Sequence, residues 1–175
     1  MQLKSLVRTI PHHPQPGVMF RDITTLLKDA AGFRAMVEAL AGRYRDARVA
    51  KVAGIEARGF IVAAPLAFAL GAGFVPLRKR GRLPAATVGH DYALEYGTDR
   101  IEMHVDAVAP GERVLVADDL IATGGTAEAA VKLIGGAGGE VVECCFAIEL
   151  PDLGGRARLE AFGHPSFALV AFEGD

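Results

Sequence analysis

One continuous segment limits the fold of this chain more than any other. Four apolar residues, 114–117, are followed by Asp118 and Asp119 and then by the turn Thr123-Gly124-Gly125-Thr126. The apolar run predicts a strand buried on both faces, and apolar residues at helical spacing after residue 126 predict a helix. A strand, a polar turn and a helix in this order are the building unit of α/β proteins.

Other parts of the chain repeat this alternation. The predicted strands are 49–53, 73–77, 113–117 and 141–150, and the predicted helices are 31–45 with Asp29 as N-cap, a stretch within 59–70, and one that begins near 127. Such alternation predicts a mostly parallel, twisted sheet with helices on both faces. The length and the lack of a linker or repeat predict one domain over residues 1–175.

The segment between the second strand and the acidic turn has a different pattern. Residues 78–82 form a basic loop, and polar and apolar residues alternate imperfectly over 87–105 around Gly97. This pattern predicts an exposed, two-stranded excursion from the sheet.

Charge and hydropathy argue against two classes of partner. The net charge of −2 argues against a general nucleic-acid binder, which needs a basic face. Residues 59–77 carry no charge and could just span a bilayer. Glycines and prolines interrupt this stretch, so a helix followed by a buried strand is the better interpretation and no membrane partner is expected: Pro65, Gly71, Gly73 and Pro76.

The two cysteines, Cys144 and Cys145, are adjacent in a predicted strand. Neighbours in sequence rarely form a disulfide without strain. We therefore expect two small core residues and a reducing, cytoplasmic compartment.

The turn after the acidic pair has the features of a phosphate site. Ligands of α/β sheets bind beyond the carboxyl ends of the strands, and a helix N-terminus offers free N–H groups to an anion. Gly124 and Gly125 allow close approach of the backbone, and Thr123 and Thr126 add hydroxyl donors. The P-loop pattern, G-x-x-x-x-G-K-[ST], does not occur in the chain.

Asp118 and Asp119 cannot themselves serve a phosphate. A carboxylate about 4 Å from a phosphate charge is repelled by about 4 kcal/mol at an effective dielectric constant near 20. These acids must face a neutral or positive group, such as a sugar diol or a metal-bound water. A phosphate on the turn and hydroxyls on the acids together describe a ribose 5-phosphate. Alternatively, the acids only start a turn and Thr123–Thr126 only cap a helix.

The run 114–126 resembles the phosphoribosyl-pyrophosphate signature of the type I phosphoribosyltransferases. Four further segments resemble the adenine-specific members of that family: 16–23, 56–60, 78–84 and 94–97. The similarity extends from about Pro14 to Phe172, in the order of the family. It implies the type I phosphoribosyltransferase fold with a small hood and a mobile catalytic loop at about residues 80–104.

The resemblance also implies the reaction. Family members join adenine to 5-phospho-α-D-ribose 1-diphosphate, giving AMP and pyrophosphate in purine salvage. Mg²⁺ is the implied cofactor, held mainly through ligand oxygens and water rather than directly by protein side chains. The implied partners are these small molecules and a second copy of the chain in a homodimer.

Site residues follow from the resemblance by position. The ribose 5-phosphate is expected on Asp118, Asp119, Ala122, Thr123, Gly124, Gly125 and Thr126. Pyrophosphate is expected on Arg58, Arg78 and Lys79, and adenine on Met19, Phe20, Arg21 and Leu150. Catalytic roles are expected for Arg58, for Glu95 as the proton carrier to or from the purine, and for Tyr96 in closing the site. The family can carry a cis peptide at the position of Glu56-Ala57.

Without the resemblance, several of these residues have ordinary interpretations. The basic run 78–80 would be a solvated surface, Glu95 a surface residue, and Phe20 and Leu150 core. Two other functions stay open: a transferase for xanthine, hypoxanthine or guanine, and a regulator that senses the phosphoribosyl ligand. The apolar Phe20 and Leu150 favour adenine, and the absence of a DNA-binding extension argues against a regulator.

Overall fold

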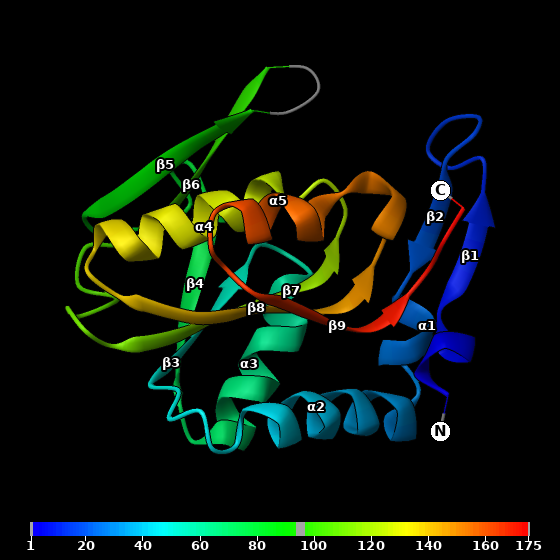
Figure 1. The fold of residues 1–175 in the computed structure, drawn as a ribbon, viewed down its shortest axis with the longest axis horizontal. Helices are drawn as coiled ribbons and strands as arrows, with labels where there is room; N and C mark the ends of the chain where they lie inside the picture. The colour runs from blue at the N-terminus through cyan, green and yellow to red at the C-terminus, as the bar shows by residue number, and fades with distance from the viewer. Residues whose placement is uncertain (1, 94–96, 175) are drawn as a thin grey trace.

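A computed structural model describes residues 2–93 and 97–174 as a layered α/β structure (Figure 1). The central sheet has seven strands in the order β5-β6-β4-β3-β7-β8-β9. The strands are β3 (Lys51–Ile55), β4 (Gly73–Lys79), β5 (Thr87–Ala93), β6 (Thr98–His104), β7 (Arg113–Ile121), β8 (Glu140–Glu149) and β9 (Ser166–Ala171). Five neighbouring strands, β4 to β9 in this order, are parallel, whereas β6 and β5 run antiparallel at one edge.

Helices cover both faces of this sheet, as the alternation of strands and helices predicts. On one face lie α1 (Thr24–Leu27), α2 (Ala30–Tyr44) and α3 (Gly59–Leu70), and on the other lie α4 (Gly125–Gly136) and α5 (Gly155–Ala161) (Figure 1). Short 3₁₀ turns are present at Leu3–Leu6 and Pro151–Leu153. The fold class predicted from the sequence is therefore confirmed.

Strand β7 shows why an apolar run marks a strand buried on both faces. Val114 and Val116 pack into the core beneath α4, whereas Leu115 and Ala117 pack into the core beneath α2 and α3. Successive side chains of a strand point to opposite faces, so both sets must be apolar. The adjacent Cys144 and Cys145 on β8 divide between the two cores in the same way, and both are free, buried thiols.

Helix α2 begins and packs as its sequence indicates. The Asp29 carboxylate accepts a hydrogen bond from the Gly32 N–H at 2.7 Å, which satisfies one free donor of the first turn. Met36, Leu40 and Tyr44, spaced four residues apart, are buried on one side of the helix. The predicted helix and its N-cap are thus confirmed.

The structure corrects the predictions for two strand ends and for the burial of the excursion. Strand β7 continues through Asp118 and Asp119 to Ile121, because its backbone goes on pairing with β8. Strand β4 includes Arg78 and Lys79, which pair with β6, so these two residues do not belong to a loop. The two-stranded excursion exists as β5 and β6, but the prediction that it is exposed is wrong for β6, where Ile101 and Met103 are fully buried.

Several elements were not predicted. The first strands, β1 (Arg8–Pro11) and β2 (Met19–Asp22), form a separate antiparallel pair on the side of the molecule toward which β9 points (Figure 1). Helix α5 and strand β9 were also missed. In the described part of the chain, no helix is long and apolar enough to cross a membrane.

Candidate active site

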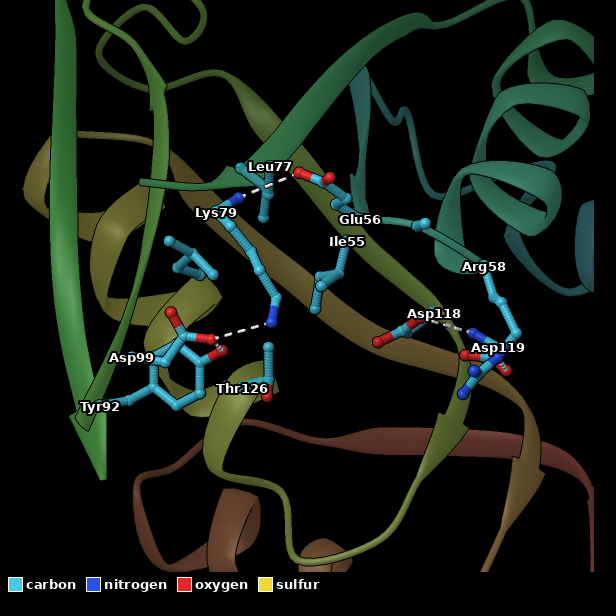
Figure 2. A pocket seen from close by; sticks show the side chains of 12 residues that line it. Ile55, Glu56, Arg58, Leu77, Lys79, Tyr92, Asp99, Asp118, Asp119 and Thr126 are labelled. Carbon is cyan, nitrogen blue, oxygen red and sulfur yellow. Dashed lines mark hydrogen bonds and ion pairs between the residues drawn. The ribbon is translucent and has the colours of Figure 1, made fainter. Parts of the chain in front are cut away.

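A cavity of about 340 Å³ opens at the carboxyl ends of β3, β4 and β7 (Figure 2). Its walls carry two basic residues, Arg58 and Lys79, and four acidic ones, Glu56, Asp99, Asp118 and Asp119. This is the edge of a parallel sheet at which α/β proteins bind their ligands. The topology therefore brings together charged residues that are far apart in the sequence.

A second hollow, of about 120 Å³, lies at the turn between β7 and α4 and is lined by Leu120–Ala127 together with Asp118 and Phe146. Asp118 and Thr126 line both hollows, so the two adjoin. One end is a polar turn at a helix N-terminus, and the other end holds the basic side chains.

The turn itself has a backbone that requires glycine. Gly124 is in the left-handed region, with φ of 77°. A Cβ added there would lie 2.8 Å from the carbonyl oxygen of Gly155, the first residue of α5. The N-cap residue of α4, Gly124, makes no side-chain hydrogen bond. No side chain of the N-cap residue therefore occupies the first N–H groups of α4, which is compatible with the predicted phosphate site.

The acidic pair near the end of β7 lies against the start of α3. Arg58 Nε donates to Asp119 Oδ2 at 2.5 Å, and this hydrogen bond raises the pKa of Arg58. The Asp119 N–H donates to Asp118 Oδ1 at 2.8 Å. A Cβ on Gly59 would lie 2.5 Å from that Asp118 oxygen, so glycine makes room for the acid. Burial, together with the neighbouring charge of Asp119, raises the pKa of Asp118 well above its usual range.

Lys79 points into the cavity from the end of β4 (Figure 2). Its ammonium lies 3.1 Å from Asp99 Oδ2, and hydrogen bonding to this carboxylate raises the pKa of Lys79. The Tyr92 hydroxyl donates to the same oxygen of Asp99 at 3.2 Å. Residues of the β5–β6 hairpin therefore form one wall of the site.

Glu56 closes another side of the cavity. Its Oε2 accepts from Arg78 Nε and from the Lys79 N–H, each at 3.1 Å. Burial opposes ionisation of Glu56, but these hydrogen bonds outweigh it and lower its pKa. The Glu56–Ala57 peptide is cis, as the family resemblance allows.

The structure brings together most of the predicted phosphate and pyrophosphate residues. Those that line the two hollows are Arg58, Lys79, Asp118, Asp119, Ala122, Thr123, Gly124, Gly125 and Thr126. Arg78 lines neither hollow; its guanidinium bonds instead to Glu56 and to the Arg82 carbonyl.

The residues predicted to bind adenine lie apart from these two hollows. Met19, Phe20 and Arg21 belong to β2, where the Phe20 ring meets His13 edge to face at 5.1 Å between ring centroids. Leu150 is buried directly after β8, and its N–H donates to the Ile121 carbonyl. Glu95 and Tyr96 lie outside the described residues.

Three polar residues of the cavity were not predicted as site residues: Glu56, Tyr92 and Asp99. Two of them lie in the hairpin, where Tyr92 pairs directly with Asp99 in the register of β5 and β6. An excursion centred on Gly97 would instead place Tyr92 opposite Glu102, so the sequence pattern does not give the register of this hairpin. Its position over the cavity follows only from the pairing of β6 with β4.

Comparison with known proteins places this geometry in a family. Residues 22–160 match the sequence profile of the family described as "Phosphoribosyl transferase domain". The chain is 65% identical over 175 residues to an adenine phosphoribosyltransferase of Nitrosospira multiformis, and the match covers 100% of both chains.

Solved structures give the same result. A crystal structure of adenine phosphoribosyltransferase from Rhodothermus marinus superposes with a TM-score of 0.91 at 52% identity, covering 97% of this chain and 96% of that one. The enzyme from Saccharomyces cerevisiae, solved with adenine and an imino-altritol bisphosphate, superposes with a TM-score of 0.90 at 35% identity, covering 97% of each chain.

Proposed function

This chain belongs to the adenine phosphoribosyltransferase family, and we propose that it carries out the reaction of that family in the two adjoining hollows. The reaction joins adenine to 5-phospho-α-D-ribose 1-diphosphate. The products are AMP and pyrophosphate, so the protein is a pentosyl-transferring enzyme of purine salvage. The observation that carries the proposal is that Asp118 and Thr126 line both hollows. A ligand with a phosphate at one end and a diphosphate at the other can thus lie across the acidic pair.

The phosphate end of the ligand belongs at the turn 122–126. Backbone N–H groups there face an anion without a competing side-chain cap. Each N–H bonded to a charged oxygen contributes roughly 1.5–3 kcal/mol. The 5′-phosphate is therefore the group that anchors the substrate.

The diphosphate end belongs at Arg58 and Lys79. Arg58 reaches the larger hollow from the start of α3, and Lys79 reaches it from the end of β4. Cations placed where negative charge develops on a leaving group lower the barrier to its departure. Arg78 would bind pyrophosphate only after giving up its hydrogen bond to Glu56.

The acidic pair belongs beside the ribose. As the bond to pyrophosphate breaks, positive charge develops on the sugar ring, and the nearby Asp118 and Asp119 stabilise it. Arg58 holds Asp119 in place through the 2.5 Å contact, so the same side chain orients an acid and faces the leaving group.

Mg²⁺ is the cofactor that we assign to this site. Among the described residues, no group of three or more histidine, cysteine, aspartate or glutamate side chains is arranged as a metal site. Magnesium prefers few protein ligands and keeps substrate oxygens and water. Asp118 and Asp119 offer hard oxygen atoms that fit hydrogen bonds to the waters of such an ion. When bound, the ion neutralises the charge of the leaving pyrophosphate.

Adenine is assigned to β2 and the end of β8. Phe20, half-buried on β2, would stack on one face of the purine, with Leu150 on the other and the backbone of Met19 and Arg21 at its edge. Glu95 would take up or return the purine proton, and Tyr96 would help to close the site. This assignment takes residues 1–175 as one domain with a mobile catalytic loop at about residues 80–104.

A homodimer in the cytoplasm completes the proposal. Ile61 and Phe68 lie seven residues apart on α3, on the same helix face, and Phe68 is 89% exposed. Phe74, next to this helix through its edge contact with Phe60, is also exposed. An exposed apolar patch of this kind fits a second copy of the chain. The free thiols of Cys144 and Cys145 fit a reducing compartment.

The test is nucleotide synthesis with Mg²⁺ and the phosphoribosyl donor in the presence of each purine base in turn. We expect AMP from adenine and little product from hypoxanthine, guanine or xanthine. A nucleotide from an oxopurine in place of AMP would identify a sister transferase. Donor binding without any nucleotide would identify a sensor of the ligand.

A further inference from the structure

Asp99 is a charged residue of the large cavity to which the proposed reaction gives no role. It lies near the start of β6, and its carboxylate is fixed by three donors. Lys79 Nζ lies 3.1 Å from Oδ2, the Tyr92 hydroxyl donates to Oδ2 at 3.2 Å, and the Arg100 N–H donates to Oδ1 at 2.8 Å. The side chain is thus held toward the cavity (Figure 2).

The position of Asp99 follows from the register of the hairpin. Tyr92 of β5 pairs directly with Asp99 of β6, so the two side chains share one face of the hairpin. Thr126, the last residue of the turn 122–126, lies next to Tyr92 and interacts with its hydroxyl. Asp99 therefore contacts the cation that we assign to pyrophosphate and is linked to Thr126 through Tyr92.

The charge of Asp99 matters because the Asp99 carboxylate and pyrophosphate would both bind the single ammonium group of Lys79. In the structure, Asp99 forms an ion pair with this ammonium, and the Asp99 side chain is only 23% exposed. A pyrophosphate that reaches Lys79 must share the donors of this ammonium with the carboxylate of Asp99. It also brings further negative charge close to Asp99, and like charges at such distances repel.

We propose that Asp99 is a positioning residue that holds Lys79 inside the cavity and competes with pyrophosphate for it, which limits how tightly the leaving group is retained. This inference rests on the proposed function, since it takes Lys79 as part of the pyrophosphate site. In the free site, Asp99 keeps the ammonium directed toward the ligand. In the product complex, the same carboxylate offers Lys79 another partner and so favours release.

The test is the affinity for magnesium pyrophosphate, measured by calorimetry and as product inhibition against the phosphoribosyl donor. The substitution Asp99→Asn removes the charge and keeps an oxygen for the Arg100 N–H. We expect it to bind pyrophosphate about 1.5- to 5-fold more tightly, the range expected of a partly exposed ion pair. Asp99→Glu keeps the charge and should bind pyrophosphate as the unmodified chain does.

A matched control is present on the same hairpin. Asp91 on β5 pairs with Arg100 at 3.1 Å, is largely exposed and does not line the cavity. Asp91→Asn removes one negative charge from the hairpin without freeing Lys79. We expect its pyrophosphate affinity to match that of the unmodified chain, and thermal unfolding of each variant checks that the fold is kept.

A double-substitution cycle with Lys79→Met separates this role from a purely structural one. If Asp99 acts through Lys79, Asp99→Asn should give no gain in affinity once Lys79 is methionine. An equal gain in that background, or no gain in the single variant, would overturn the inference. If Lys79→Met itself leaves pyrophosphate affinity unchanged, the assignment of Lys79 in the proposed function fails as well. If it weakens binding while Asp99→Asn has no effect, only the role of Asp99 fails.

Discussion

The Nε atom of Arg58 lies 2.5 Å from the carboxylate of Asp119, although 61 residues separate them in the chain. Arg58 follows β3 and Asp119 lies near the end of β7, and these strands are neighbours in the sheet. The contact therefore joins the end of the sheet that we assign to pyrophosphate with the acids that we assign to the ribose.

Replacing Arg58 by glutamine should impair donor binding and turnover together. The change removes a cation from the pyrophosphate end and leaves Asp119, only 9% exposed, without its charged partner. Arg58 is itself half-exposed, so we take the cost as that of one hydrogen bond to a charged group, roughly 1.5–3 kcal/mol, or about 10- to 150-fold in kcat/KM for the donor. Steady-state kinetics at saturating adenine measure this, with the exposed Arg34→Gln on α2 as the control. Equal kcat/KM values in the two variants would contradict the assignment.

Replacing Asp118 by asparagine should stabilise the protein while impairing its reaction. Burial and the Asp119 charge raise the pKa of Asp118, so the folded protein resists its ionisation. Asp118 therefore lowers the free energy of unfolding once the pH exceeds its pKa in the unfolded chain, about 3.9. This penalty grows until the pH passes the pKa of Asp118 in the folded protein. At pH 7 we expect Asp118→Asn to melt about 2–4 °C higher, the shift for about 1 kcal/mol in a chain of this size.

The measurement for Asp118 is thermal unfolding from pH 4 to pH 8, together with AMP formation. The gain in melting temperature should shrink as the pH falls toward about 4, because the acid then becomes protonated in the unfolded chain as well as in the folded protein. Asp119→Asn is the comparison, and it should show no gain because it loses its contact with Arg58. A lower melting temperature for Asp118→Asn at pH 7 would refute the account.

Gly124→Ala should damage the phosphate turn. Alanine at a φ of 77° costs about 1–2 kcal/mol, and its Cβ would meet the Gly155 backbone at 2.8 Å. We expect the KM for the phosphoribosyl donor to rise at least about 10-fold, for a loss of about 1.4 kcal/mol of binding. Gly135→Ala, in the same helix with no atom within 4 Å of the added Cβ, should instead stabilise by about 1 kcal/mol. Donor kinetics and urea unfolding distinguish the two, and similar effects would count against a special role of the turn.

Asp22 should contribute stability that disappears in acid. Hydrogen bonds from the Thr24 side chain and from Arg8 lower the pKa of Asp22 to about 2. A lowered pKa means that the contribution is present above the unfolded value and is lost as the pH falls through the folded one. Asp22→Asn should therefore be less stable at pH 7 by about 1 kcal/mol, after allowing for the exposed Arg8, and the deficit should close as the pH approaches 2. Urea unfolding over this range checks it, with the exposed Asp46→Asn as a control that should show no deficit.

Phe68→Glu should separate the proposed dimer without unfolding the chain. The side chain is 89% exposed, so a charge there disturbs no core packing within one copy. Sedimentation at micromolar concentration should give twice the chain mass for the natural sequence and for Val105→Glu, an exposed site on the hairpin side. Phe68→Glu should sediment as one copy. A dimer that survives this change would place the interface on another face.

The residues of the phosphate turn were predictable from the sequence because their chemistry is local. Alternating burial explains the apolar run of β7, and the glycines with the helix start explain the anion site within a few residues of it. The acids Asp118 and Asp119 follow in the same segment. Neighbours along the chain are enough to specify such a unit, whatever lies beside it in the sheet.

The pairing of distant charges was decided only by the tertiary structure. Arg58 meets Asp119 because β3 lies beside β7, and Lys79 meets Asp99 because β6 pairs antiparallel with β4. Strand order and register arise from packing between segments many residues apart, which local spacing does not encode. The sequence therefore predicted which residues would meet a charged ligand, whereas the strand order of the folded sheet decided which side chains these residues contact.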